Sequence, residues 1–465
     1  MRQVTSLGPL TIDDSQLTAL LRSQELTVGI YGLGWMGLPT ACLFLEAGAK
    51  VLGVDVDERI VELVNAGESP IDEKGIRQII EKHIGSNFSV TSDLRGTSAI
   101  CDVIILIVPT FIDSGHKPDY SAIEKAAHEI GFKLRRGSLL ILESTVAPGV
   151  TEELLKPIVE RNSGLSAGKD FLLAYSPIRA MVGRALKDIK TYPRIVGALD
   201  EKSLNAAVTV MRMIVQGSII KVRNIRTAEA VELFENIYRD MNIALANELS
   251  FFCERTGLDF LEVREAANSQ PYSHLHVPGV GGSGPSIPVN PYFLIASGRK
   301  AGIDLRLVKA GCIRNAKMAA HTVELAEEAL EDCRRTVGRS TITILGISYR
   351  ANVKEPRNSP NLEIIRRLRR MGGKVKVFDP FFGAEELREM GYVSSDSLER
   401  AVQGANCLIV AVGHDQFKSL PLKRLAQLMR RPACIVDAAR VVNAEEARKH
   451  GFIYYGTGYG LESSL

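Results

Sequence analysis

The chain has few of the features that mark metal, membrane or nucleic-acid proteins. Its seven cysteines are scattered, and no two have Cys-x-x-Cys spacing, so we expect neither a zinc knuckle nor a dithiol redox site, and no metal. No uninterrupted apolar run reaches the roughly 18 residues that span a bilayer. The 57 basic residues nearly balance the 54 acidic ones, for a formal net charge of +3. This balance gives no electrostatic reason to expect a nucleic-acid partner.

The first residues of the chain and its cysteine content indicate the cellular compartment in which we expect the protein. Residues 1–23 lack a positively charged segment followed by an apolar run, so we predict no signal peptide. An odd and sparse set of cysteines is typical of reduced thiols. We therefore expect a soluble, cytoplasmic protein with no membrane partner. Its 465 residues, 45% hydrophobic and 24% charged, suit two or three globular domains.

Short apolar runs alternate with helical stretches in the first half of the chain. Such alternation predicts parallel strands joined by right-handed crossovers. The predicted strands cover residues 26–31, 50–54, 103–108, 138–142, 171–175 and 194–196. After residue 222 the pattern changes, because residues 227–255 contain neither proline nor glycine and carry apolar residues at helical spacing. This stretch predicts one long helix, and residues 291–335 continue the helical sequence.

Alternation returns after residue 337, with predicted strands at residues 341–345, 374–378, 407–412 and 434–436. This unit partly repeats the first, because Gly346 precedes Asp379 as Gly32 precedes Asp55. We predict an α/β protein with two Rossmann-like parallel-sheet domains joined by a long central helical domain. The expected boundaries are 1–222 for the first domain, 223–336 for the helical domain and 337–465 for the last.

The sequence Gly32-Leu33-Gly34-Trp35-Met36-Gly37 follows a predicted strand and opens a predicted helix. Gly32 permits a tight turn, Gly34 lets the backbone approach a pyrophosphate, and Gly37 lets helix and strand pack closely. Asp55 ends the next strand, where it can accept hydrogen bonds from the adenosine ribose and repel a 2′-phosphate. The pattern predicts a dinucleotide site that takes NAD rather than NADP. Glycines that only turn the chain are the alternative.

Four further segments carry groups of interest at informative places. Pro109, Thr110 and Thr145 follow strands, at the sheet edge where ligands bind. Hydroxyl groups that cap the following turns are an equally good alternative for each threonine. Glu232 and Asn236 share one face of the long helix. A face that is solvated or that contacts a second subunit would also explain polar residues there.

Gly279, Gly281 and Gly282 expose backbone N–H groups that can hold an anion or a sugar, or they form a hinge. Ser286 follows these glycines without an adjacent histidine, so it is a poor nucleophile.

Taken together, these segments resemble the nucleotide-sugar dehydrogenases, which act on UDP-glucose, GDP-mannose and UDP-N-acetylmannosamine. Residues 235–240 (ENIYRD) and 288–293 (PVNPYF) look most like the UDP-N-acetylmannosamine branch, followed by the UDP-N-acetylglucosamine branch. The resemblance spans residues 26–437 and rests on residues 32–37, 108–110, 143–149, 175–177, 227–248, 278–293 and 346–360.

The resemblance implies an enzyme that oxidises the C6 alcohol of a sugar to a carboxylate with two NAD. A cysteine thiol holds the aldehyde, an aspartate helps to activate water, and a lysine with an asparagine stabilises the oxyanion. A glutamate near the reacting carbon serves acid–base chemistry. The resemblance also implies that the first domain holds NAD, that the third holds the UDP moiety, and that the chain is a homodimer through its central helices.

Several family positions are substituted in this chain. Ser286 stands at the cysteine position, Asn290 at the aspartate position, Glu232 at the lysine position and Ile178 at the glutamate position. Asn236, Thr145 and Arg357 are retained, and Arg350, which stands at a lysine position, can still bind phosphate. In the same segment Glu355 replaces an aspartate, and Ser283 replaces a glycine.

Two functions follow from these residues. One is a dehydrogenase of a UDP-amino sugar whose activity is impaired or altered, because a serine hydroxyl rarely ionises and Glu232 reverses a required charge. The other is an inactive homologue that binds NAD and a nucleotide sugar in a regulatory or partner role. On side-chain chemistry, the sequence favours loss or alteration of activity.

Overall fold

The computed structural model describes residue 9 and residues 12–460, and these fall into two compact units. Unit 1 comprises Met1–Glu235 and Tyr292–Ile303, and unit 2 comprises Asn236–Pro291 and Asp304–Leu465. The long helix α10 (Ile225–Thr256) contributes residues to both, and it confirms the long helix predicted over residues 227–255. The three-domain division stays a prediction. No helix in the described ranges is long and apolar enough to cross a bilayer.

Unit 1 is built on an eight-stranded sheet in the order β10-β9-β8-β7-β4-β1-β2-β3. A two-stranded antiparallel ribbon, β5 with β6, follows β4. The strands are β1 (Thr27–Tyr31), β2 (Lys50–Val54), β3 (Phe88–Thr91), β4 (Val103–Leu106), β5 (Phe111–Ile112), β6 (Pro118–Asp119), β7 (Leu139–Leu142), β8 (Leu172–Tyr175), β9 (Arg194–Ala198) and β10 (Ile219–Lys221).

Helices cover both faces of this sheet because successive side chains along each strand point alternately toward two cores. Val103 and Ile105 of β4 join the core that includes α2 and α9, whereas Ile104 and Leu106 join the core of α6 and α7. The helices are α1 (Asp14–Arg22), α2 (Gly37–Glu46), α3 (Glu58–Asn65), α4 (Ile76–His83), α5 (Leu94–Ser98), α6 (Ser121–Lys133), the π-helical turn η1 (Thr151–Leu155), α7 (Lys156–Ser163), α8 (Ala185–Thr191), α9 (Glu201–Arg212) and α12 (Asn290–Lys300).

One expectation about this sheet is wrong. Strand–helix alternation predicted parallel strands throughout, but β8 and β9 pair antiparallel, through Ala174–Ala198 and Tyr175–Gly197. The connection between them contains only the seven-residue helix α8. Alternation in a sequence shows that a helix lies between two strands, but it does not show the direction in which the second strand returns.

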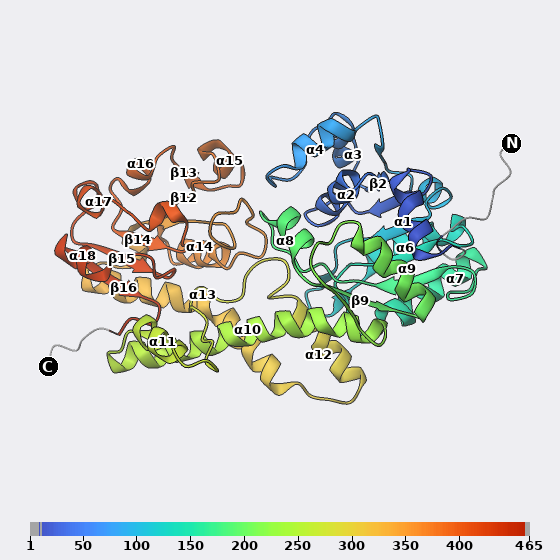
Figure 1. Cartoon of the computed structure of the whole chain (residues 1–465). Helices are drawn as coiled ribbons and strands as arrows, with labels where there is room; N and C mark the ends of the chain where they lie inside the picture. Colours follow the sequence, from blue (N-terminus) through green and yellow to red (C-terminus); the bar gives the residue numbers. More distant parts are fainter. Residues whose placement is uncertain (1–8, 10–11, 461–465) are drawn as a thin grey trace. The chain divides into compact units, whose positions relative to one another are not determined.

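Unit 2 contains a six-stranded parallel sheet in the order β13-β12-β11-β14-β15-β16. One face packs on α13 and α14, and the other packs on α16 and α17 (Figure 1). Its elements are α11 (Phe260–Asn268), α13 (Arg306–Asp332), η2 (Val337–Arg339), β11 (Thr341–Leu345), α14 (Asn361–Arg370), β12 (Lys374–Phe378), α15 (Ala384–Glu389), β13 (Val393–Ser394), α16 (Leu398–Val402), β14 (Cys407–Val410), η3 (Asp415–Phe417), α17 (Leu422–Leu428), β15 (Ala433–Asp437), α18 (Ala444–Lys449) and β16 (Phe452–Gly456).

Candidate functional site

The turn between β1 and α2 accepts glycine alone at two positions. Gly32 has a φ of +99°, and a Cβ there would lie 2.1 Å from the carbonyl oxygen of Ile107. A Cβ on Gly37 would lie 1.8 Å from the carbonyl oxygen of Gly32. A Cβ on Gly34, by contrast, would meet nothing within 4 Å. The backbone at Gly34 therefore borders open space beside the start of a helix, which is the arrangement that a pyrophosphate needs.

Asp55 is tied to this turn by its carboxylate. One oxygen, Oδ2, accepts a hydrogen bond from the N–H of Leu33 (2.8 Å), and Oδ1 accepts one from the N–H of Asp57 (3.0 Å). The side chain is half-buried. Each oxygen has a second lone pair, so the carboxylate can still accept hydrogen bonds from a ribose. Trp35 and Met36 are half-buried in the same turn.

The predicted threonines at the ends of β4 and β7 meet in the structure. Thr110 Oγ1 donates a hydrogen bond to the carbonyl oxygen of Thr145 (2.8 Å). Ser144 reinforces this junction, because its hydroxyl donates to the carbonyl oxygen of Val108 (2.7 Å) and accepts from the Val108 N–H (2.9 Å). Pro109 lies between these contacts. The loops that follow β4 and β7 are therefore hydrogen-bonded to each other at one edge of the sheet. They lie next to β1, the strand before the glycine turn, because β1 pairs with β4.

Glu232 of α10 lies against that edge and is buried, with 8% of its surface exposed. Its carboxyl group accepts hydrogen bonds from Thr145 Oγ1 (2.7 Å) and from the Tyr175 hydroxyl (3.1 Å). Burial raises its pKa to about 7, although the two hydroxyl groups act in the opposite direction. The position therefore presents a carboxyl group that is partly protonated near neutral pH, and no fixed positive charge.

Two other buried acids surround this group. Glu229, one turn earlier on α10, accepts hydrogen bonds from the N–H of Gly149 (2.5 Å) and from the N–H and hydroxyl of Thr151 (2.8 and 2.6 Å). Burial raises its pKa to about 7. Glu143 pairs with Arg194, and both side chains are buried. Unit 1 thus holds Glu229 and Glu143 as buried acids in addition to Glu232, with Arg194 as the partner of Glu143.

Ile178 offers no titratable group to this region. It packs, partly buried, against the core of α2 and α9. The next residue, Arg179, pairs with Glu235 of α10 (2.7 Å). The residue after Ile178 therefore brings a cation to α10.

In unit 2, the glycine-rich segment packs on α10 and α13. The N–H of Gly279 donates to Asn247 Oδ1 (2.9 Å). Gly281 has a φ of +105°, and a Cβ there would lie 2.2 Å from the carbonyl oxygen of Asn315. A Cβ on Gly282 would lie 3.1 Å from Asp240 Oδ1. The glycines therefore allow a close approach of this loop to two helices.

Asp240, Asn315 and Cys312 form a polar cluster beside these glycines. Asn315 Nδ2 donates to Asp240 Oδ1 (2.7 Å), and Cys312 Sγ lies 3.9 Å from Asp240 Oδ2. Burial raises the pKa of Asp240 to about 6. Burial and the Asp240 charge raise the pKa of Cys312 to about 12, so this half-buried thiol stays protonated at neutral pH.

The same glycine-rich segment leads to the predicted Ser286 and Asn290. The carbonyl oxygen of Ser286 accepts hydrogen bonds from the N–H of Val289 (3.1 Å) and of Asn290 (2.8 Å), which starts α12. Ser286 and Asn236 are half-buried, and Asn290 is buried. These three belong to unit 2, whereas Thr145, Ile178 and Glu232 belong to unit 1.

The predicted arginines lie on the loop after β11, next to the glycine-rich segment. The N–H of Gly284 donates to the carbonyl oxygen of Asn358 (3.3 Å), and a Cβ on Gly284 would lie 2.7 Å from the Tyr349 ring. Arg357 forms an ion pair with Glu355 (2.6 Å). The guanidinium of Arg350 lies 6.0 Å from the centre of the Tyr349 ring. Unit 2 thus brings together two segments that are far apart in the sequence.

Sequence reasoning missed the partners that hold these groups. Tyr175 ends β8, and its position at a strand end was the available signal. Asp240 and Asn315 lie on separate helices, and no spacing rule in one chain connects them.

Comparisons with known proteins agree with this architecture. Residues 26–215 match the NAD binding domain of the UDP-glucose/GDP-mannose dehydrogenase family, residues 226–317 its central domain and residues 343–444 its UDP binding domain. The chain is 33% identical over 439 residues to a UDP-N-acetyl-D-mannosamine dehydrogenase of Pyrococcus horikoshii, covering 94% of this chain and 100% of the relative.

Solved structures give the same result. A UDP-D-ManNAc dehydrogenase from Pyrococcus horikoshii superposes with a TM-score of 0.86 at 33% identity, over 94% of this chain and 100% of that one. An NDP-N-acetyl-D-galactosaminuronic acid dehydrogenase from Methanosarcina mazei superposes with a TM-score of 0.79 at 30% identity, over 97% and 98% of the two chains. With three family domains in order and a relative matched over its whole length, the chain belongs to the UDP-glucose/GDP-mannose dehydrogenase family.

Proposed function

We propose that this chain binds NAD and a UDP-amino sugar of the N-acetylmannosamine or N-acetylglucosamine type, with impaired or altered oxidation at C6. In the full family reaction, two successive hydride transfers to NAD and the addition of water convert the C6 alcohol to a carboxylate. Membership in the family supports the substrate class and the cofactor. NAD and nucleotide sugars are cytoplasmic metabolites, so the proposal places the protein there.

The glycine turn supports NAD as the cofactor. Gly32 and Gly37 are compatible with no larger side chain, the backbone at Gly34 borders open space, and Asp55 is anchored beside the turn. When bound, NAD supplies the hydride acceptor. The Asp55 carboxylate would hold the adenosine ribose and disfavour the 2′-phosphate of NADP by charge repulsion. Thr110 and Thr145 are proposed to line the nicotinamide side.

The buried carboxyl group of Glu232 is the observation that carries the proposal of impaired or altered oxidation. Its hydrogen bonds to Thr145 and Tyr175 fix it at the edge of the NAD-binding sheet. An oxyanion needs donors or positive charge, and loss of one such donor costs about 10²–10³ in rate. Ser286 and Ile178 remove a thiol nucleophile and a proton-exchanging group, which adds to the loss.

A role without catalysis is the second proposal. It is supported by the contrast between intact binding elements and the altered polar groups. Gly34 and Asp55 keep the geometry of a dinucleotide turn, and Arg357 stays on the loop of the UDP binding domain. Such a protein would hold NAD and a nucleotide sugar and act on a partner.

We also infer a homodimer that forms through α10. Tyr238, Leu245 and Phe252 are spaced by seven residues, which places them on one face of this helix. Each side chain is at least half exposed, at 62%, 50% and 60%. A face of this size and composition is typical of a protein interface.

The test is a paired measurement of binding and turnover. Calorimetry with NAD, and with UDP-N-acetylmannosamine and UDP-N-acetylglucosamine, measures binding, while NADH absorbance measures oxidation. We expect binding with turnover at least 10³-fold below that of an active family member. Steady formation of two NADH per sugar would contradict the non-catalytic role, and formation at the rate of an active family member would also contradict impairment. One NADH per sugar would indicate oxidation that stops at the aldehyde.

A reversal variant sharpens this test. The triple variant Ser286→Cys, Glu232→Lys and Ile178→Glu should gain turnover if these positions cause the loss. A variant with Glu248→Lys, on the exposed face of α10, adds the same positive charge elsewhere and should gain none. Absence of any gain in the triple variant, with NAD binding intact, would show that these three positions are not sufficient.

A further inference from the structure

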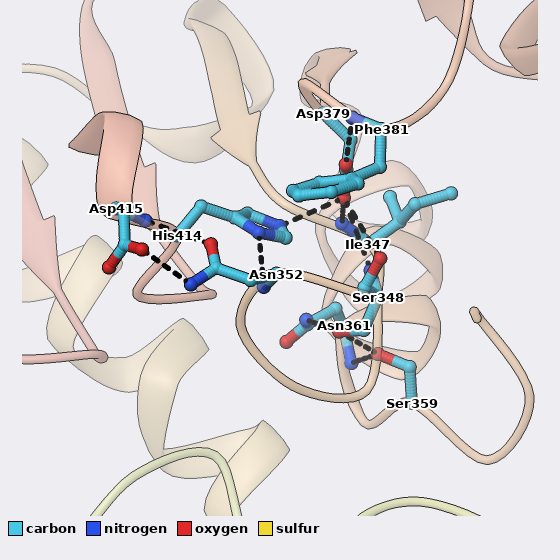
Figure 2. Close-up of polar contacts among 9 residues, drawn as sticks. All are labelled: Ile347, Ser348, Asn352, Ser359, Asn361, Asp379, Phe381, His414 and Asp415. Carbon is cyan, nitrogen blue, oxygen red and sulfur yellow. Dashed lines mark hydrogen bonds and ion pairs between the residues drawn. The ribbon is translucent and has the colours of Figure 1, made fainter. Parts of the chain in front are cut away.

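A fully buried carboxylate, that of Asp379, accepts hydrogen bonds from several loops at the carboxyl ends of the strands in unit 2. Asp379 follows β12, and its Oδ2 accepts hydrogen bonds from the N–H of Ile347 (2.9 Å) and Ser348 (3.3 Å), as Figure 2 shows. His414 Nε2 lies 3.3 Å from the same oxygen, and Oδ1 accepts from the N–H of Phe381 (2.9 Å). Burial acts to raise the pKa of Asp379, but His414 and the backbone donors outweigh it, and the pKa lies below its usual range.

The corresponding acid in unit 1 has fewer protein partners. Asp55 also ends the strand that pairs with the first strand of its sheet, and it accepts from the N–H groups of Leu33 and Asp57 while half-buried. Asp379 has 1% of its surface exposed and meets donors from three loops. Asp55 in unit 1 therefore keeps lone pairs that can reach a ribose, whereas Asp379, at the corresponding place in unit 2, fixes protein loops.

His414 connects Asp379 to the loop after β11 through hydrogen bonds at both of its ring nitrogens. Its Nδ1 accepts a hydrogen bond from the N–H of Asn352 (2.9 Å). A backbone N–H can only donate, so Nδ1 carries no proton and Nε2–H donates to Asp379. His414 is completely buried, and its ring stacks at a tilt against Phe381 with centroids 5.1 Å apart. One imidazole thus joins the end of β12 to the loop after β11.

Asn352 is held at further points. Its side-chain Nδ2 donates to Asp415 Oδ2 (2.8 Å), and its Oδ1 accepts from the N–H of Asp415 (3.1 Å). The residue has a φ of +60°, a left-handed conformation that costs about 1 kcal/mol for a residue other than glycine. The contacts in Figure 2 maintain this conformation. The backbone at Asn352 is therefore set by its partners rather than by local preference.

We propose that His414 is a positioning residue for the nucleotide sugar: by fixing Asn352, it holds the loop that carries Arg350 and Arg357 in the geometry that receives the diphosphate of a uridine nucleotide. The inference rests on the proposed function, because that function assigns these arginines to the substrate. A loop that is ordered before binding loses less entropy when the ligand arrives, so the two hydrogen bonds of the imidazole support affinity without contact to the ligand.

Two substitutions at His414 separate its two hydrogen bonds. His414→Asn keeps an acceptor at the place of Nδ1 for the Asn352 N–H, whereas His414→Gln keeps a donor at the place of Nε2 for Asp379. Calorimetry with uridine diphosphate should show affinity about tenfold weaker in His414→Gln and within about threefold of the unaltered chain in His414→Asn. NAD affinity should be unchanged in both. His450→Asn, at the end of α18 in the same unit, is the matched control.

The outcomes distinguish failure of the role of His414 from failure of the proposed function. Equal uridine diphosphate affinity in His414→Gln and the unaltered chain overturns this inference alone, and an equal loss in both His414 variants overturns the role of the Asn352 bond. Absence of uridine diphosphate binding in the unaltered chain overturns the proposed function as well. If both variants fail to fold, amide hydrogen exchange of the unaltered chain replaces them. The Asn352 N–H should be protected without ligand, because it donates to His414 Nδ1, and protection that appears only when uridine diphosphate is added overturns the proposal.

Discussion

At the scale of single residues, Glu232 shows how burial sets the chemistry of a position. A carboxyl group in water is ionised at neutral pH, but two hydroxyl donors replace only part of the hydration that Glu232 loses on burial. Its pKa therefore rises to about 7. The group alternates between a neutral and an anionic form in the range where enzymes work, and neither form supplies the positive charge that an oxyanion requires.

The stability of unit 1 should depend on pH through this residue. In the unfolded chain Glu232 loses its proton near pH 4.5, whereas in the folded chain it keeps the proton to about pH 7. Between these values the folded state binds more protons, so the free energy of unfolding falls as pH rises from 4.5 to 7, by on the order of 3 kcal/mol. Glu232→Gln should remove this part of the slope.

The measurement is urea unfolding at several pH values between 5 and 8. The chain has a single tryptophan, Trp35, which lies in the glycine turn, so its fluorescence reports on unit 1. Glu62→Gln, an exposed carboxylate on α3, is the control and should leave the slope unchanged. Equal slopes for Glu232→Gln and the unaltered chain would show that Glu232 ionises at the same pH in both states.

At the scale of elements, one buried arginine connects the ends of three strands. Arg194, the first residue of β9, pairs with Glu143, which follows β7. It also donates to the hydroxyl (2.8 Å) and carbonyl (3.1 Å) of Ser176, which follows β8. These contacts lie where β9 runs antiparallel to β8. The ion pair therefore fixes the place where the chain reverses direction in the sheet.

Removal of this arginine should destabilise unit 1 strongly. Arg194→Met leaves Glu143 buried without its cation, and the free energy of unfolding should fall by about 3–5 kcal/mol. The double variant Arg194→Met, Glu143→Met should recover most of the loss, because no buried charge is left unpaired. Trp35 fluorescence in urea measures both. Arg59→Met removes an exposed pair with Asp57 and should change stability by less than about 1 kcal/mol.

Local patterns explain which elements could be predicted from the sequence. Apolar runs such as residues 103–108 mark strands buried on both faces, and the glycine turn requires its residues locally. Phe88–Thr91 is not among the predicted strands, because the short β3 mixes exposed with buried residues. Phe452–Gly456 is also not among them, although glycines flank its aromatic run. No local pattern marks the direction of β9, and the ion pair that connects it to the end of β7 joins Arg194 to Glu143, which are far apart in the sequence.

The residues of the candidate site also fall into those that a local pattern predicts and those that only the tertiary fold brings together. Gly32, Gly34 and Asp55 lie within one strand–turn–helix–strand unit, so their spacing predicted the geometry that the structure has. The hydrogen bond from Tyr175 to Glu232, and the bond from Asn352 to His414, join residues that only the tertiary fold brings together. The roles of these residues therefore depend on contacts that a single sequence does not record.

At the scale of the whole molecule, the proposed function gives α10 a part in both ligand binding and assembly. Glu232 lies on its buried face, while Tyr238, Leu245 and Phe252 form an exposed apolar face. Exposed apolar area of this kind lowers the free energy when a second chain covers it, at about 25 cal/mol per Å² removed from water. A dimer through this face would make the conformation of α10, and with it the position of Glu232, depend on association.

Charge placed on this face should separate the chains. The double variant Leu245→Glu, Phe252→Glu would bring four carboxylates into a two-fold interface, where desolvation and repulsion cost several kcal/mol. Light scattering should give twice 50.8 kDa for the unaltered chain and 50.8 kDa for the variant. A second double variant, Ile100→Glu with Val393→Glu, charges two other exposed apolar positions and should keep the dimer mass. If the α10 variant stays dimeric, the chains associate through another surface; if it becomes monomeric and also loses NAD affinity, assembly and the cofactor site are coupled through this helix.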